Sequence, residues 1–357
     1  MTIRVGVIGA GIMGADHVRN LAGAVSGAAV ELVADLDAER AAQAARTAGA
    51  RSTTDPMALI KDPDVDAVVI ASHDSTHAEL LLACLEARRP VLCEKPLAPT
   101  VEEGRSVVEA EEALAAELGR SLVSLGFMRR FDPAHTELRR RLGAGELGEP
   151  LVAHCVSRNV RSAPDATNAS AITNSAIHEL DSMPWLLGTE VAEAAWLPGR
   201  KASSLAPAGL QDPAFMLLRM ADGTLVTLEL FLNAEYGYST RLELVGERGT
   251  ASFTESPLLE LSVDRVRATD YPADWRPRFA DAYRIELQAW IDSLRTGTPS
   301  PLATARDGLR ASETAAALVA SIEAGGAFVP VVHSAPRTAS GAAFPAAANA
   351  VSAVAQA

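Results

Sequence analysis

The chain has 357 residues, of which 45 are acidic and 32 basic, so its formal net charge is −13. Such an acidic surface argues against nucleic acid and anionic membranes as partners, because both select basic patches. A hydrophobic content of 48% with 22% charged residues is typical of a soluble globular protein, and the length favours two domains. The three cysteines form no CxxC pair and no 18-residue apolar stretch occurs, so we expect a cytoplasmic protein without a disulfide framework.

The first 125 residues alternate short apolar runs with alanine-rich, charged segments of helical length. This alternation predicts βαβ units, and the lack of polar residues within the runs predicts a parallel sheet that is covered on both faces. The expected domain is therefore a doubly wound α/β domain over residues 1–125. Strands are expected at 3–8, 30–34, 67–71, 90–93 and 122–125, and helices at 12–24, 37–49, 76–88 and 100–118.

After Gly126 the apolar runs become longer and alternate with polar residues, which is typical of strands with one exposed face. Two runs flank Asp222-Gly223, a strong hairpin signal. We expect a second α/β domain over 126–333 with an open, mostly antiparallel sheet, followed by a low-complexity tail over 334–357 that forms a mobile end or a short helix docked on a neighbouring subunit. Strands are expected at 151–158, 214–220, 224–232 and 240–245, and helices near 178–188, 280–296 and 304–324.

A glycine-rich motif follows the first strand. Gly9-Ala10-Gly11-Ile12-Met13-Gly14 has the GxGxxG spacing, and it opens the first helix. In this context the glycines allow a tight turn, close approach of backbone to a pyrophosphate, and helix–strand packing. The alternative is a purely structural glycine turn.

Asp35 lies 21 residues after Gly14, at the end of the second predicted strand. A carboxylate at this point accepts hydrogen bonds from ribose hydroxyls and repels a 2′-phosphate. Leu36 follows, with no arginine in its place. The sequence therefore predicts NAD rather than NADP as the cofactor, with a solvated aspartate as the alternative.

Glu94-Lys95-Pro96 directly follows the strand at 90–93. Ligands of doubly wound sheets bind beyond the carboxyl ends of strands, so Lys95 is expected to point at the cofactor crevice. Pro96 fixes the turn and is a candidate for a cis peptide bond. The alternative is a surface lysine before a loop proline.

Together, GAGIMG, Asp35, THAELLLACLEARRPVLCEKPLA, GFMRRFDPA and NSAIHELD resemble the Gfo/Idh/MocA oxidoreductases, and within them the bacterial inositol dehydrogenases. FLNAEYGY and DWRPRFADAYRIELQAWIDSL extend the resemblance over about residues 3–330. It implies a Rossmann domain followed by an α/β domain whose sheet forms subunit contacts, in a homotetramer or a dimer. The implied activity is reversible oxidation of a secondary alcohol of a cyclitol or sugar, with NAD as hydride acceptor.

The chemistry of this reaction suits the residue types. Loss of hydride from a carbinol carbon requires loss of the hydroxyl proton, and His178 is the candidate general base. Lys95 is the candidate for stabilising the developing alkoxide. His178 and Asp181 are three residues apart and share a helix face, with Trp185 as the packing anchor of that helix. The alternative for His178 is a hydrogen-bonded core histidine.

The resemblance also implies a set of pocket residues. Arg129 matches the arginine that touches the polyol, with a solvated Arg129–Arg130 pair as the alternative. The other candidates for substrate binding are Ser157, Asn159, Asn174, His178, Trp275, and Tyr236 or Tyr238; for each of Asn159, the tyrosines and Trp275, core or surface packing stays open. The cofactor set adds Ser72, His73, His77, Glu94 and Lys95 to the glycine motif, Asp35 and Leu36. His73 and His77 have i, i+4 spacing but no third ligand, so we predict no metal site.

Two positions depart from the family pattern, and both lie on the substrate side. Asn174 stands four residues before His178, where the family has a catalytic aspartate, and it can supply a hydrogen bond but no charge. Ser157 stands where inositol dehydrogenases have a histidine. We therefore expect retained hydride chemistry and an altered substrate. A non-catalytic NAD-binding sensor or regulator, and an NAD-dependent glycosidase that oxidises, eliminates and re-reduces, are the alternatives.

Overall fold

The computed structural model describes residues 1–199, 201–253 and 260–334. The predicted tail lies outside the described residues except for Ser334. Among the described residues, no helix is both long enough and apolar enough to cross a membrane.

The N-terminal half forms a six-stranded parallel sheet with helices on both faces, as predicted. The strand order β3-β2-β1-β4-β5-β6 reverses direction between β1 and β4, and in such sheets ligands bind in the crevice at that point. The strands are β1 (Ile3–Ile8), β2 (Ala28–Ala34), β3 (Arg51–Thr53), β4 (Ala67–Ile70), β5 (Val91–Glu94) and β6 (Val123–Gly126). The helices are α1 (Ile12–Gly23), α2 (Ala38–Ala48), α3 (Pro56–Lys61), α4 (His77–Glu86) and α5 (Val101–Leu118), and η1 (Asp74–Thr76) is a 3₁₀ turn.

Strand β3 and helix α3 were not predicted, for physical reasons that can be read from their residues. β3 is a polar edge strand of three residues, so it has no hydrophobic pattern to reveal it. α3 is only six residues long, too short to show a helical period, although Asp55 caps it and Pro56 occupies its first turn.

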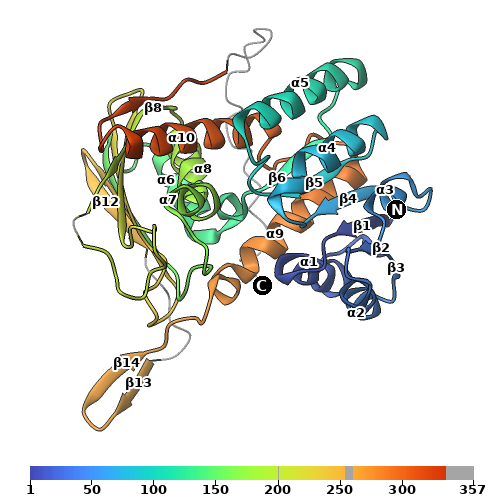
Figure 1. The fold of residues 1–357 in the computed structure, drawn as a ribbon, viewed down its shortest axis with the longest axis horizontal. Helices are drawn as coiled ribbons and strands as arrows, with labels where there is room; N and C mark the ends of the chain where they lie inside the picture. The colour runs from blue at the N-terminus through green and yellow to red at the C-terminus, as the bar shows by residue number, and fades with distance from the viewer. Residues whose placement is uncertain (200, 254–259, 335–357) are drawn as a thin grey trace, which may run out of the picture.

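The C-terminal half forms a mixed, mostly antiparallel sheet in the order β12-β11-β7-β10-β9-β8-β15, in which β7 and β10 pair in parallel. A separate hairpin of β13 and β14 projects from the body (Figure 1). The strands are β7 (Pro150–Arg158), β8 (Val191–Leu197), β9 (Ala214–Met220), β10 (Leu225–Phe231), β11 (Ser239–Gly246), β12 (Gly249–Phe253), β13 (Glu260–Val263), β14 (Val266–Thr269) and β15 (Val329–Pro330).

The helices of this half cover one face of the sheet and reach back to the first domain (Figure 1). They are the 3₁₀ turn η2 (Met128–Phe131), α6 (Pro133–Gly143), α7 (Asn168–Ala171), the π turn η3 (Ile172–Ala176), α8 (Ile177–Leu187), α9 (Trp275–Thr296) and α10 (Ala305–Glu323). Leu287, Trp290 and Ile291 of α9 are buried in the same core cluster as Val5 and Val7 of β1. The end of α9 therefore stabilises the cofactor domain from a distant part of the sequence.

Helix α9 begins at Trp275, five residues before the predicted start at 280. Phe279 has non-helical backbone angles (φ −112°, ψ 16°), so the helix is kinked there. The predicted helix corresponds to the segment after the kink. The short segment before it, capped by Asp274, carries Trp275 to the substrate side.

Candidate active site

The glycine-rich loop joins β1 to α1 at the crevice. Gly9 has φ +92°, and a Cβ there would lie 2.6 Å from the backbone of Ala71. At Gly14 a Cβ would lie 1.8 Å from the carbonyl oxygen of Gly9, so both positions require glycine. Gly11 differs, because a Cβ there would meet no atom within 4 Å. Its missing side chain leaves open space on the ligand side of the loop.

The N-terminus of α1 faces that open space, and no side chain of its first turn neutralises its partial positive charge. Its N-cap, Gly11, has no side chain to bond the first N–H groups, and the first turn contains no acid. Such a terminus offers N–H donors and a positive dipole end to phosphates. Ile12 is 58% exposed here, and Met13 lines the neighbouring cavity. The loop and helix together fit the pyrophosphate of a dinucleotide.

Asp35 is held at the end of β2 by four hydrogen bonds, one of them from Arg40 Nε at 3.3 Å. The N–H groups of Ala10 and Asp37 donate to its carboxylate at 2.8 Å each, and Arg40 Nη2 donates at 2.8 Å. Burial opposes ionisation, but these donors hold the pKa of Asp35 below its usual value. The carboxylate is therefore charged and oriented, as binding to ribose hydroxyls requires.

Arg40 is a residue that the sequence reasoning missed. Only the position after Asp35 was considered, and its occupant, Leu36, is 84% exposed with no role in this cluster. Arg40 reaches back from the first turn of α2. The sequence signal for Arg40 is its position in the first turn of the predicted helix, five residues after Asp35.

The two histidines after β4 differ in their surroundings. His77 is buried, with Nδ1 2.6 Å from the carbonyl oxygen of Pro96 and Nε2 3.2 Å from that of Ser72. It therefore ties the turn after β4 to the turn after β5, and it does not line the cavity described below. His73 has an exposed side chain and caps η1 through Ser75. No group of three metal-ligating side chains was found among the described residues.

Lys95 lies at the carboxyl end of β5, and the Lys95–Pro96 peptide bond is cis, as the sequence suggested. Its Nζ donates to the carbonyl oxygen of Asn174 at 3.0 Å, which joins the two domains across the crevice. Burial lowers the pKa of Lys95, and the nearby Glu94 opposes that shift.

Glu94 is buried behind this lysine and contacts His17 of α1, with Oε1 2.8 Å from Nε2. Burial alone would raise the pKa of Glu94, but His17, Lys95 and His77 hold it below its usual value. The carboxylate is therefore charged beside Lys95. His17 was not identified from the sequence, because a single histidine in a helix gives no signal of a buried partner.

His178 lies in the first turn of α8 and lines the cavity. Burial, together with the positive charges of Lys95 and Arg129, lowers its pKa well below the usual 6.5. The imidazole is therefore neutral near pH 7 and can accept a proton. Its Nδ1 is buried and has no hydrogen-bond partner in the described part of the chain, so the amide of Asn174 does not orient it.

The consecutive arginines of η2 are paired with acids of α8, so the alternative of two solvated arginines is wrong. Arg129 is buried and bonds Glu179. Arg130 binds both oxygens of Asp181, at 2.5 and 3.0 Å. Asp181 therefore serves Arg130 and not His178, although the two share a side of the helix.

These groups surround one cavity of about 220 Å³ between the two domains. The predicted residues that line it are Met13, Glu94, Lys95, Arg129, Ser157, Asn159, Asn174, His178 and Trp275. Residues that sequence reasoning did not single out are Met128, Ser175, Leu230, Leu232 and Tyr283.

Of the two candidate tyrosines, Tyr238 lines the cavity and Tyr236 does not. Tyr236 is 45% exposed, and its hydroxyl accepts a hydrogen bond from Arg158 at 3.0 Å. Tyr236, predicted as one of two candidate tyrosines for substrate binding, therefore lies outside this cavity. Residues two apart in a regular strand would share one side, but the backbone is irregular here, with positive φ at Glu235 and Gly237, so the sequence does not say which ring faces the cavity.

Residues 3–119 match the Gfo/Idh/MocA oxidoreductase family with an NAD-binding Rossmann fold, and residues 139–331 match the C-terminal α/β domain of the same family. The chain belongs to the Gfo/Idh/MocA oxidoreductases. As a member of this family it uses NAD, which agrees with the open loop at Gly11 and the charged Asp35.

Individual relatives within the Gfo/Idh/MocA family are named for cyclitol oxidation. Inositol 2-dehydrogenase 2 of Paenarthrobacter aurescens is 59% identical over 94% of this chain and 100% of its own length. Inositol 2-dehydrogenase/D-chiro-inositol 3-dehydrogenase of Shouchella clausii is 41% identical over 91% of this chain and 93% of its own. The crystal structure of myo-inositol dehydrogenase from Lactobacillus casei with NAD(H) and myo-inositol has a TM-score of 0.88 and 33% identity, covering 94% of this chain and 99% of that one.

Proposed function

We propose that this NAD-dependent oxidoreductase transfers a hydride between a secondary hydroxyl of a cyclitol or sugar and the nicotinamide, in a substrate pocket altered at Asn174 and Ser157. The observation that carries the proposal is the meeting of Lys95, His178 and Arg129 in one cavity that also contains Met13 of the cofactor loop. NAD supplies the hydride acceptor when bound. The residues of this chain supply the rest of the chemistry.

His178 is proposed as the general base. Its depressed pKa keeps the ring neutral, so a lone pair is available for the hydroxyl proton. The same burial that keeps it neutral makes the protonated form costly, which favours return of the proton in the reverse reaction.

Lys95 is proposed to hold the hydroxyl oxygen and to stabilise the alkoxide charge that develops as the proton leaves. Its present acceptor, the carbonyl oxygen of Asn174, shows that Nζ already points across the crevice. The charged carboxylate of Glu94 lies behind it and favours the ammonium form.

Arg129 and Ser157 are proposed to bind the other hydroxyls of the substrate. Arg129 Nη2 lies 3.5 Å from Ser157 Oγ, and both groups line the cavity. A serine is smaller than the histidine of related pockets and leaves extra space at this point. The pocket is therefore suited to a ring that differs from myo-inositol in the position or size of one substituent.

We also propose a homo-oligomer of cytoplasmic subunits joined through the face of the seven-stranded sheet that the helices leave open. Val152, Leu225 and Phe231 are partly exposed on that face and Phe215 is 39% exposed, and an apolar sheet face of this kind favours subunit contact. Light scattering of the purified chain measures the subunit number, and a monomer at micromolar concentration would contradict the proposal.

The second candidate function is a sensor that binds NAD without turnover. The unpartnered Nδ1 of His178 favours it, because a base with no orienting group is a weaker catalyst. Incubation of the purified chain with NAD and a panel of cyclitols and sugars distinguishes the two. NADH absorbance that rises with at least one polyol supports the dehydrogenase.

The Lys95→Ala variant is the control, because it should bind NAD and produce no NADH. If no compound yields NADH while NAD binding is retained, the sensor is correct. Release of an aglycone from linked sugars with no net NADH would instead indicate a glycosidase.

A further inference from the structure

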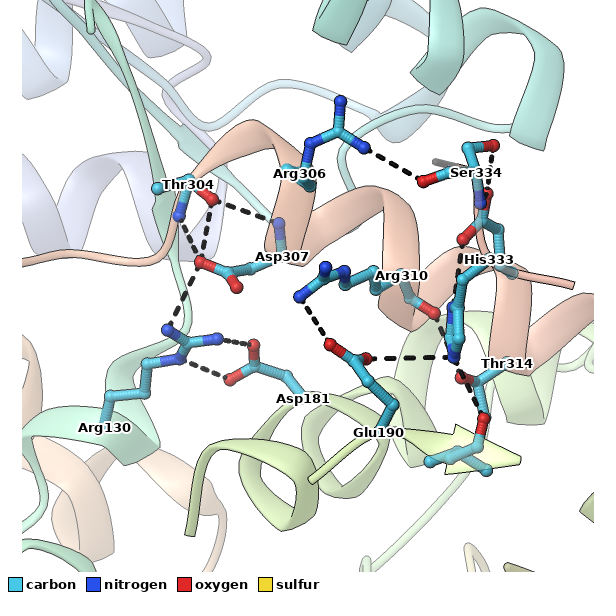
Figure 2. Close-up of polar contacts among 12 residues, drawn as sticks. Arg130, Asp181, Glu190, Thr304, Arg306, Asp307, Arg310, Thr314, His333 and Ser334 are labelled. Carbon is cyan, nitrogen blue, oxygen red and sulfur yellow. Dashed lines mark hydrogen bonds and ion pairs between the residues drawn. The ribbon is translucent and has the colours of Figure 1, made fainter. Parts of the chain in front are cut away.

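A second cavity of about 280 Å³ lies between α6, α8, α10 and the segment around His333. No residue that lines it also lines the substrate cavity. Figure 2 shows the charged residues around it, among them Arg130, Asp181, Arg310 and His333. The proposed reaction uses none of these groups.

The two cavities are neighbours along one side of α8. His178, Asp181 and Trp185 follow one another at intervals of three and four residues, so they share that side. His178 lines the substrate cavity, whereas Asp181 and Trp185 line the second one. The Arg130–Asp181 pair therefore lies next to the general base, in the wall of the second cavity.

The acids of the second cavity already have partners. Both oxygens of Asp181 accept from Arg130, and Asp307 accepts from the backbone N–H and the hydroxyl of Thr304 at 2.8 Å each. Glu190 lies 2.6 Å from Arg310 Nη1 and 3.8 Å from His333 Nε2. Most of these carboxylate oxygens therefore already accept a hydrogen bond or face a cation, with Oδ1 of Asp307 as the exception, since the bonds to Asp307 reach Oδ2.

Donor capacity, in contrast, is left over. The guanidinium of Arg139 lies 4.4 Å over the ring of Trp185, and within the described residues it has no hydrogen bond and no ion pair. Burial and the nearby Arg130 lower the pKa of Arg139, and the charge of Asp307 only partly opposes that shift. Arg310 Nε is buried and has no partner in the described part of the chain. Two cationic side chains of one cavity thus keep unused N–H groups.

We propose that this cavity binds a small molecule through an oxyanion, a carboxylate or a phosphate, held by Arg139 and Arg310. Guanidinium groups bind such oxyanions through paired, charge-assisted hydrogen bonds. A bound anion would also compete with Asp181 for Arg130. Occupancy of the cavity would thereby weaken the Arg130–Asp181 ion pair, one turn of α8 away from His178. The site is separate from substrate and cofactor binding, so its test does not depend on the proposed reaction.

Calorimetric titration of the NAD-saturated chain with inorganic phosphate, and separately with malonate, tests the proposal. Sodium chloride keeps the ionic strength constant, and saturating NAD occupies the phosphate-binding N-terminus of α1. We expect saturable binding of at least one probe, and the stronger of the two identifies the source of the oxyanion.

Three variants locate the binding. Arg139→Gln removes a charge that has no ion-pair partner among the described residues, and Arg310→Lys keeps a charge beside Glu190 but removes Nε; each should weaken binding about tenfold. Arg141→Ala, on the same helix α6 but outside the cavity, is the matched control and should bind like the wild type. Melting temperatures without ligand show whether each variant is folded.

The proposal is overturned if all three variants bind the probe with the affinity of the wild type. It is also overturned if neither probe shows saturable binding. Binding of scyllo-inositol or another neutral polyol, with no binding of the anions, would overturn it as well. Each of these outcomes would mean that the charge of Arg139 does not bind a ligand in this cavity.

Discussion

On the cofactor side of the crevice, the glycine loop and the carboxylate of Asp35 lie close together in the sequence, and the loop presents backbone N–H groups at the start of α1. On the substrate side the cavity is lined by side chains from segments as far apart as Lys95, His178 and Trp275, each of them partly buried. The first arrangement depends on chain geometry and the second on tertiary packing. Gly9 and Gly14 therefore cannot be replaced without a backbone clash, whereas a position such as Asn174 is constrained by the side chains around it.

The two sides also differ in how charge is held. Arg40, which pairs with Asp35, is largely exposed, so water screens that ion pair. Arg129 and Glu179 are buried and Lys95 is partly buried, and desolvation shifts the pKa of Lys95 and His178 downward. Substitutions on the substrate side should therefore act mainly on rate and pH dependence, and those on the cofactor side on binding preference.

The largest expected effect is that of Lys95→Ala. Removal of the group that stabilises the alkoxide should lower kcat by about three orders of magnitude, while the dissociation constant of NAD changes little. Steady-state kinetics and NAD titration measure the two quantities. Lys61→Ala, at the exposed end of α3, is the control, and near-normal turnover of Lys95→Ala would remove the basis for the assignment of Lys95.

The next effect concerns the cofactor side. Asp35→Ser combined with Leu36→Arg should shift the kcat/KM ratio from NAD toward NADP by about two orders of magnitude, because a repelling charge is lost and Arg40 is released to meet a 2′-phosphate. Leu36→Arg alone is the control and should change the ratio much less. An unchanged preference in the double variant would falsify the ribose-binding role of Asp35.

A smaller effect is expected at the substrate side from Asn174→Asp. A negative charge near His178 favours the protonated imidazole, so the pKa of His178 should rise. The acidic limb of the kcat/KM profile, which reports loss of the neutral base below that pKa, should move to higher pH by about one unit. If Asn174 is the residue that limits activity on myo-inositol, the Asn174→Asp variant should be more active on that substrate.

Thr173→Asp, one residue earlier and outside the cavity, is the matched control for this charge. If both variants leave the acidic limb in place, position 174 does not act through His178. A loss of activity on the preferred substrate would show that Asn174 is adapted to that substrate.

The smallest effect is on stability. Glu286 is completely buried in α9, neither of its oxygens has a partner among the described residues, and burial, Glu94 and Asp181 raise its pKa well above 4.5. The unfolded chain ionises this group at neutral pH, so folding must take up a proton, and Glu286→Gln should stabilise the protein by about 1–3 kcal/mol at pH 7.

That gain should vanish below pH 4.5, where the unfolded chain also holds the proton. Urea denaturation at several pH values measures it. Glu109→Gln, on an exposed position of α5, is the control. A destabilised Glu286→Gln variant at pH 7 would mean that the carboxylate is needed in the fold.

Much of the first domain could be predicted because its information is local. β1 matches its predicted bounds, and the glycine motif, Asp35 and Lys95 follow strands that the apolar runs reveal. The strand β8 was missed because VAEAAWL is followed by a long irregular segment and has alanine where strands favour β-branched residues. Local pattern was sufficient for most strands of the first domain and for the parallel character of its sheet.

The partners of the substrate-side charges could not be predicted, since they depend on which helices pack together. Spacing correctly placed His178 and Asp181 on one side of α8, but it could not show that Arg130 would occupy Asp181. For the same reason the sequence left Tyr236 and Tyr238 as alternatives. Each of these contacts joins residues that are 50 or more positions apart or that lie on irregular backbone.

The π turn before α8 has a further consequence. It places five residues, Ile172–Ala176, in a wider turn than an α-helix has, and the Asn174 carbonyl that Lys95 binds lies within it. Deletion of one residue there would restore an ordinary helix and rotate everything before it by about 100° relative to α8. The number of residues in this turn therefore affects the geometry of the substrate cavity, in addition to the identity of those residues. Insertions and deletions, and not only substitutions, can retune what such a pocket accepts.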